Sequence, residues 1–94
     1  MNQTQFNTIE TGLTFEQALT ALKAGVLIRS SSWSKNNHRL MLITPEINPD
    51  IRESFIAYYI QDGMFMPWSP SSAHILSEDW ETIEAIESVE EGQE

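Results

Sequence analysis

The sequence of 94 residues contains no cysteine, which excludes disulfide bonds, thiolate metal sites and thiol nucleophiles. It has four glycines and no glycine-rich loop of the kind that cradles phosphate groups. No apolar run approaches the roughly 20 residues that span a bilayer, and the polar start of the chain does not resemble a secretory signal. We therefore expect a cytoplasmic protein with no membrane as a partner.

Signals for catalysis and metal binding are equally sparse. The two histidines, His38 and His74, share no metal-ligand spacing with each other or with carboxylates. Several serines are present, but none lies in the strand-turn-helix elbow that presents a nucleophile. We therefore expect no metal, no cofactor and no enzymatic activity.

Basic residues are missing from the C-terminal part of the chain. Residues 78–94 contain eight acidic residues and no base, whereas residues 1–77 hold six acids and all five bases. The net charge of −9 therefore arises at the C-terminus, and the nearly neutral body would not repel an anionic ligand. The acidic segment favours solubility, and it leaves open a second class of protein, an acidic interaction inhibitor that imitates nucleic acid.

The length of the chain suffices for one domain with one core. So small a domain is expected to be marginally stable alone, and self-association would bury more of its surface. We divide the chain into a flexible lead-in of residues 1–12, a single domain of residues 13–86 and an acidic disordered tail of residues 87–94. The lead-in shows no hydrophobic periodicity, and the tail is rich in Glu, Gly, Gln and Ser.

One helix and several short strands are expected in the domain. Thr14 and Gln17 have capping-box spacing, an apolar face recurs at helical spacing, and Gly25 is placed for a left-handed turn, which together predict a helix over residues 15–24. Apolar and β-branched runs predict strands at residues 26–29, 40–44, 55–61, 64–66 and 80–83. The pattern predicts an α+β fold, with one N-terminal helix packed on a small antiparallel β-sheet with long loops.

Two further local structures are predicted between residues 61 and 77. Asp62-Gly63 is typical of a two-residue hairpin turn. Residues 69–77 could form one helical turn capped by Ser69.

Two tryptophan-bearing segments lie in the expected long loops. Residues 33–37 read Trp-Ser-Lys-Asn-Asn, and residues 67–71 read Pro-Trp-Ser-Pro-Ser. An exposed indole offers a face for stacking, and nearby hydroxyls and amides can orient a flat polar ligand such as a nucleotide base. The alternative is that both indoles complete the core, which is the role we expect for Trp80.

We expect the methionines of the predicted hairpin to lie in the core. Met64 and Met66 could form adaptable ligand walls, but filling of the core is the favoured interpretation.

The order and spacing of several segments resemble the small phage proteins of the second Thoeris anti-defence type. The matching segments are Phe15-Glu16-Gln17-Ala18-Leu19, Leu22-Lys23-Ala24-Gly25, Ile28-Arg29, Trp33, Met41, Pro67-Trp68, Pro70-Ser71 and Ile75-Leu76-Ser77-Glu78-Asp79-Trp80. The resemblance covers about Leu13 to Ile83. Its most specific part is the Leu-x-x-Asp-Trp stretch combined with the two earlier tryptophans.

The resemblance implies a phage sponge protein and not an enzyme. Members of that family bind the cyclic ADP-ribose isomer that carries the Thoeris signal, without cleaving it, inside the infected bacterial cell. They are homotetramers with pockets where protomers meet, and some also bind cyclic dinucleotides. A nucleic-acid polymer is not expected as a partner. The acidic interaction inhibitor and a purely structural domain remain as alternatives.

The matched positions imply roles for individual residues. Trp33 and Trp68 would be stacking or wall residues, and Ser34 and Asn36 would contact ribose or phosphate. Further polar contacts would come from Ser69, Ser71 and Asp79.

The chain departs from the family pattern at three places, one of which is Arg29, because the family's arginine is usually one position closer to the tryptophan. The first loop reads Ser-Trp-Ser-Lys at residues 32–35 where the family often reads Gly-Trp-Asn-Gly. His74 stands where the family commonly has Asp. We include His74 among the expected ligand-binding residues, because exchanging an acid for an imidazole would alter the preferred ligand.

Overall fold

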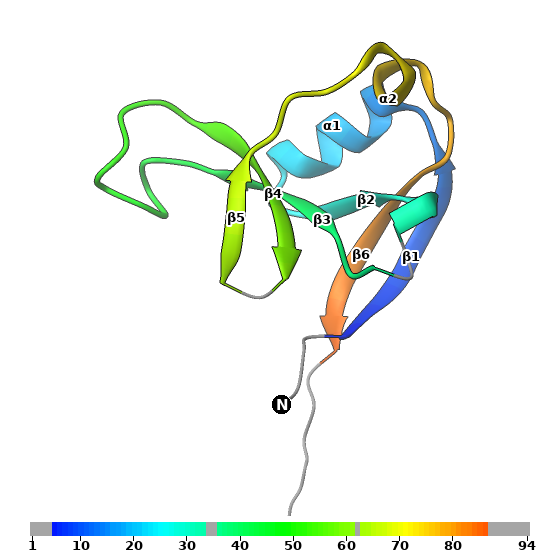
Figure 1. Ribbon diagram of the computed structural model, residues 1–94, viewed down its shortest axis with the longest axis horizontal. Helices are drawn as coiled ribbons and strands as arrows, with labels where there is room; N and C mark the ends of the chain where they lie inside the picture. Colours follow the sequence, from blue (N-terminus) through cyan, green and yellow to red (C-terminus); the bar gives the residue numbers. More distant parts are fainter. Residues whose placement is uncertain (1–4, 34–35, 62, 87–94) are drawn as a thin grey trace, which may run out of the picture.

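The computed structural model describes residues 5–33, 36–61 and 63–86. These residues form one six-stranded sheet with two short α-helices and a 3₁₀ helix (Figure 1). The elements are β1 (Gln5–Leu13), α1 (Phe15–Lys23), β2 (Leu27–Ser30), η1 (Ser31–Trp33), β3 (Arg39–Ile43), β4 (Phe55–Gln61), β5 (Met64–Pro67), α2 (Ser72–Leu76) and β6 (Trp80–Ile86). The strand order is β1-β6-β2-β3-β4-β5, and all the strand pairs are antiparallel.

Helix α1 forms where its local sequence predicts it. The Gln17 amide donates to the Thr14 hydroxyl at 3.2 Å, and the Thr14 amide donates to Gln17 Oε1 at 2.9 Å, so the capping box is complete. Gly25 follows the helix with φ +91°, a conformation that a residue with a Cβ rarely adopts. The predicted start of the helix is confirmed, and its end differs by one residue.

The predicted fold class is wrong in its proportions. Two small helices accompany a sheet of six strands, which is the dominant element of the described chain, although the fold remains roughly α+β. Strand β1 was not predicted, and all its residues except Leu13 fall in the predicted flexible lead-in of residues 1–12. The predicted cap of the second helical turn, Ser69, is also wrong, because Ser71 caps α2.

The sequence of β1 carries no strand pattern, because β1 lies at the edge of the sheet and is exposed along most of its length. Its sequence therefore needs no alternation of apolar and polar residues. Main-chain pairing with β6 holds it, from Gln5 opposite Ile86 to Leu13 opposite Trp80. The acidic tail of residues 87–94 lies outside the described residues.

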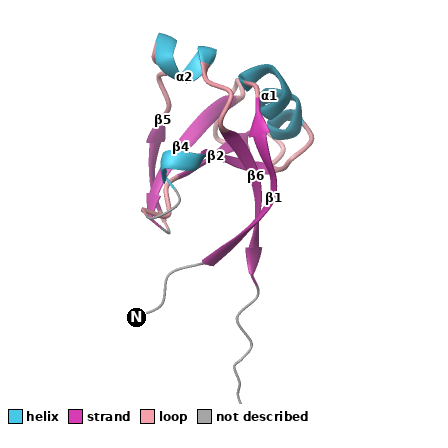
Figure 2. Cartoon of the chain, turned by 90° about the vertical axis from the view of Figure 1, so that its right-hand side faces the viewer, coloured by secondary structure: helices cyan, strands magenta, loops and turns pink. Residues whose placement is uncertain are grey.

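The main core lies between α1 and one face of the sheet. Ala18 and Leu22 of α1 are fully buried against Ile28, Leu40 and Trp80. Both helices lie at the same end of the molecule, and the β1–β6 pair runs away from them (Figure 2). In the described part of the chain, no helix is long and apolar enough to cross a membrane.

Candidate functional site

A pocket of about 430 Å³ opens between α2 and the adjoining part of the sheet. Its walls come from η1, β4, β5, the chain after β5, and α2. The lining residues are Trp33, Tyr58, Met66, Pro67, Trp68, Ser69 and His74. Residues separated by up to 41 positions in the chain, from Trp33 to His74, thus meet at one site. Pockets of this size, lined by aromatic side chains with a few polar groups, are typical of small-molecule sites.

Aromatic rings define the shape of this pocket. The His74 ring lies between two indoles, with its centroid 5.5 Å from that of Trp33 and 5.9 Å from that of Trp68. Tyr58 extends the wall, at 5.3 Å from Trp33. The arrangement can hold a flat ligand by ring contacts on more than one side.

Trp80 supports the pocket from inside the core. Its ring is fully buried and makes edge contacts with Trp33 at 5.5 Å and with Trp68 at 5.8 Å. Its Nε1 donates to the His74 carbonyl oxygen at 2.9 Å. The predicted core role of Trp80 is confirmed, and this one side chain braces three residues of the lining.

The two tryptophans of the loop segments are half-buried and not freely exposed. Trp33 ends η1, Trp68 follows β5, and both pack against the main core. The core interpretation is therefore correct in part, because each indole packs against the core. Each indole also lines the pocket, and its role in ligand binding stays a prediction.

Ser69 and His74 line the pocket, and Ser71 positions His74. The His74 amide donates to the Ser71 hydroxyl oxygen at 3.2 Å, and that hydroxyl lies 3.1 Å from His74 Nδ1. Ser71 thus caps α2 and orients the imidazole at the same time. It is not among the residues that form the pocket wall.

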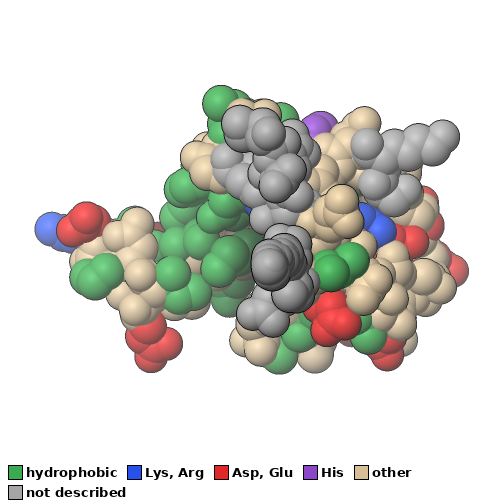
Figure 3. All heavy atoms as spheres, turned by 90° about the horizontal axis from the view of Figure 1, so that it is seen from below, with side chains coloured by type: hydrophobic (Ala, Val, Ile, Leu, Met, Phe, Trp, Pro, Cys, Tyr) green, Lys and Arg blue, Asp and Glu red, His purple; other side chains and the backbone are tan. Residues whose placement is uncertain are grey.

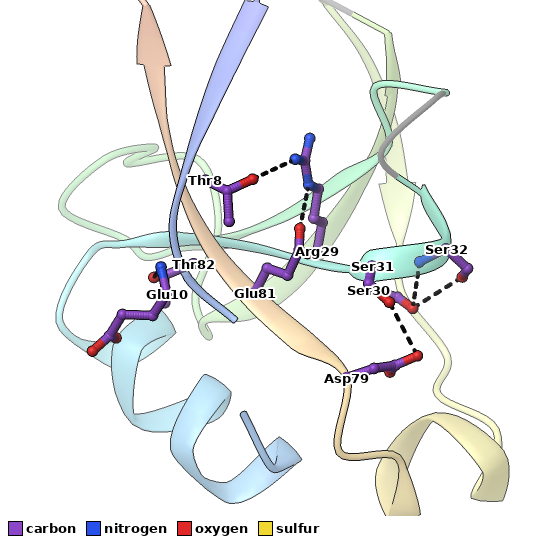
Figure 4. A network of polar contacts seen from close by, with 9 residues as sticks. All are labelled: Thr8, Glu10, Arg29, Ser30, Ser31, Ser32, Asp79, Glu81 and Thr82. Atoms are coloured by element: carbon purple, nitrogen blue, oxygen red, sulfur yellow. Dashed lines mark hydrogen bonds and ion pairs between the residues drawn. The ribbon is translucent and has the colours of Figure 1, made fainter. Parts of the chain in front are cut away.

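Asp79 and Asn36 also lie outside the lining. Asp79 accepts a hydrogen bond from the Ser31 hydroxyl at 3.2 Å (Figure 4). It also accepts one from the Ser77 hydroxyl. The carboxylate therefore fastens η1 to the chain before β6. Asn36 donates its amide to the Trp33 carbonyl at 2.9 Å and is exposed. Ser34 lies outside the described residues.

The pocket lining includes Tyr58 and Pro67, which were not predicted there, and Met66, for which a ligand wall was the less favoured alternative. An ideal two-residue turn would place Tyr59 opposite Met66, but a register shift between Tyr59 and Gln61 places Tyr58 there. Met66 is 46% exposed and Met64 is 51% exposed, so their expected place in the core is wrong. The Asp62-Gly63 signal was available for the hairpin, but the shift has no comparable signature in the sequence.

The arginines near the first tryptophan segment do not form part of the pocket lining. Arg29 is 7% exposed and forms an ion pair with Glu81, with 3.0 Å between Nε and Oε1, and its Nη2 donates to the Thr8 hydroxyl at 2.9 Å (Figure 4). The Arg39 guanidinium lies over the rings of Phe6 and Tyr59, at 4.8 and 5.0 Å.

The described residues of the pocket wall consequently offer no fixed charge. None of the lining residues in the described part of the chain is Lys or Arg. Burial raises the pKa of the Tyr58 hydroxyl, so it stays protonated well above neutral pH. The described residues contain no group of three or more His, Asp or Glu side chains placed to hold a metal ion.

These features define a small α+β domain with an aromatic-walled pocket braced by a buried tryptophan. The Thoeris anti-defense 2-like domain matches residues 13–83, and the chain belongs to this family. A similar protein, named Thoeris anti-defense 2, comes from Bacillus phage SP01 and is 26% identical over 88 residues. The alignment covers 80% of this chain and 99% of that protein. The resemblance inferred from the sequence is confirmed, and it supports a phage function against Thoeris defence.

Proposed function

We propose that this protein binds and sequesters a cyclic nucleotide immune signal without cleaving it. The ligand is a cyclic ADP-ribose isomer of the Thoeris system or a cyclic dinucleotide. The observation that carries the proposal is the convergence of Trp33, Trp68 and His74 on one pocket of about 430 Å³. Family membership supplies the defence system that the ligand would serve.

The chemistry of the lining suits the base of a nucleotide. Base–aromatic stacking contributes about 1–3 kcal/mol per base. The Ser69 hydroxyl and the His74 ring add polar groups at the wall. Sequestration of a scarce signal calls for nanomolar affinity, or about −12 kcal/mol, which one stacking contact does not supply. Further contacts and closer enclosure of the ligand are therefore needed.

A second copy of the chain is the enclosing partner that we propose, in a homo-oligomer and specifically a tetramer. Hydrophobic side chains gather beside the β4–β5 hairpin on the underside of the molecule (Figure 3). Phe65 is 45% exposed and stacks on Tyr59, with 4.9 Å between ring centroids. Exposed apolar area of this kind favours self-association.

Ligand capture tests this function directly. Purified protein is mixed with a panel of cyclic ADP-ribose isomers and cyclic dinucleotides, freed of unbound material and heat-denatured, and the supernatant is chromatographed. We expect one intact nucleotide to be recovered. Altered products would show that the protein is an enzyme, and retention of nothing would overturn the sponge interpretation.

A further inference from the structure

Tyr58 is the phenol in the pocket wall, and its hydroxyl has a defined partner. The hydroxyl lies 2.7 Å from Nδ1 of His38, and the two rings meet edge to face with 5.3 Å between their centroids. Both residues are half-buried. His38 precedes β3, the strand that pairs with β4, so the contact joins neighbouring parts of the sheet.

The direction of this hydrogen bond decides what Tyr58 offers to a ligand. If the phenol donates to His38, its oxygen keeps its lone pairs and can accept a further hydrogen bond. If His38 donates instead, the phenolic proton is free to be given to the ligand. The raised pKa of Tyr58 means that the phenol keeps its proton in either case.

Relative acidity favours donation by Tyr58. A phenol, with an ordinary pKa of about 10, is a far stronger acid than the N–H of a neutral imidazole. An imidazole nitrogen is also a better acceptor than a phenolic oxygen. With neutral His38 the favoured pair is therefore O–H···Nδ1, which places the His38 proton on Nε2 and leaves Tyr58 as an acceptor.

The remainder of the pocket narrows the class of ligand that such an acceptor would select. The lining has ring faces, a serine hydroxyl and an imidazole, and none of its residues within the described chain is Lys or Arg. A flat, uncharged ring that carries a hydrogen-bond donor on its edge matches this combination. Nucleobases with an exocyclic amine meet this description, whereas the ligand's phosphates find no Lys or Arg among the described residues of the wall.

We propose that Tyr58 accepts a hydrogen bond from the exocyclic amine of a bound base, and that His38 is a positioning residue that acts through Tyr58. This inference rests on the proposed function, because it names the part of the nucleotide that the same pocket recognises. It makes Tyr58 a specificity-determining residue outside the two tryptophan segments.

The first test needs no ligand. Long-range ¹⁵N–¹H correlation spectra at mildly alkaline pH report which nitrogen of each imidazole carries the proton. We expect the Nε2–H tautomer for His38 in the wild type and a mixture of tautomers in Tyr58→Phe. A dominant Nδ1–H tautomer in the wild type would overturn the proposal.

The second test compares two probes that differ only in the amine, adenosine 5′-monophosphate and purine riboside 5′-monophosphate, by tryptophan fluorescence titration. We expect the first to bind about tenfold more tightly to the wild type, since one unmade hydrogen bond costs about that much. Tyr58→Phe should remove the preference, and His38→Leu should reduce it, because the phenolic proton then has no fixed acceptor. His38→Gln should retain it, because the Gln carbonyl can also accept the phenolic proton.

The ratio of the two affinities separates recognition from folding, since a loosened pocket would weaken both probes alike. Persistence of the preference in Tyr58→Phe, absence of it in the wild type, or failure of both probes to bind would overturn the inference. Recovery of an intact cyclic nucleotide in the capture experiment would still support the proposed function. Failure of capture alongside a tenfold preference would instead reject sequestration and retain the role of Tyr58.

Discussion

At the scale of single residues, the three tryptophans differ in their burial and therefore in their structural roles. Trp80 is wholly inside the core, while Trp33 and Trp68 each have one side on the core and one on the pocket. Aromatic residues are recognisable in a sequence, but their exposure depends on what packs against them. The division of roles among these indoles therefore follows from contacts between distant segments.

Replacement of Trp68 by Ala should weaken binding of the captured nucleotide about 30- to 1,000-fold. Loss of a stacking wall residue costs about 2–4 kcal/mol of binding free energy. Isothermal titration calorimetry measures the loss, and sedimentation should show the oligomer unchanged. Leu76→Ala is the matched control, because Leu76 is exposed and does not line the pocket. Unchanged affinity in Trp68→Ala would count against the site.

At the scale of elements, β1 depends on a largely buried ion pair as well as on main-chain pairing. Arg29 of β2 reaches across β6, pairs with Glu81 and donates to Thr8 of β1 (Figure 4). The Glu10 amide adds a hydrogen bond to the Thr82 hydroxyl at 3.1 Å. These contacts tie the edge strand to the sheet without a continuous apolar face.

Arg29→Met should destabilise the fold by about 3 kcal/mol, because it leaves the Glu81 carboxylate largely buried without its partner. Urea unfolding measures the change, and hydrogen exchange should show that β1 loses protection first. The double variant Arg29→Met, Glu81→Leu should recover much of the loss, since it removes both charges. Equal destabilisation by the single and double variants would contradict this account.

At the scale of the whole molecule, two properties bear on the class of function and on assembly. The first is the acidic C-terminus, in which residues 87–94 hold Glu87, Glu90, Glu91 and Glu94. The second is the apolar area beside β4 and β5. They lead to two separable expectations, one about the class of function and one about assembly.

Deletion of residues 87–94 should leave nucleotide capture and folding unchanged. The cut preserves β6, whose residues Glu84 to Ile86 pair with β1 and would be lost in a longer truncation. An acidic interaction inhibitor would instead lose its partner when these four glutamates are removed. Capture by the truncated and full chains, compared side by side, separates the two classes.

Phe65→Glu should reduce the mass of the assembly, because it places a charge in the exposed apolar area. Analytical ultracentrifugation of the variant and the wild type measures the change. Glu53→Gln is the control, because Glu53 is exposed and lies outside β5, the strand that contains Phe65. A wild type that sediments as a monomer would reject the homo-oligomer, and an unchanged variant would move the interface elsewhere.

The sequence by itself determined the elements whose hydrogen bonds are local. The capping box of Thr14 and Gln17 and the turn at Gly25 predicted α1, and the aromatic and β-branched run of β4 predicted its bounds. Family membership was likewise evident from short motifs in order. Such features depend on residues a few positions apart, so they can be recognised before the chain is folded.

Only the tertiary structure decided which of these residues meet. It placed β1 at the sheet edge, set the register that puts Tyr58 opposite Met66, and gave Asp79 to Ser31 instead of to the pocket. An edge strand needs no periodic spacing of apolar residues, and a register shift leaves no recognisable pattern in the sequence. The pocket therefore forms by packing between segments that are distant in the chain. The local sequence of each segment does not show which other segments it will contact.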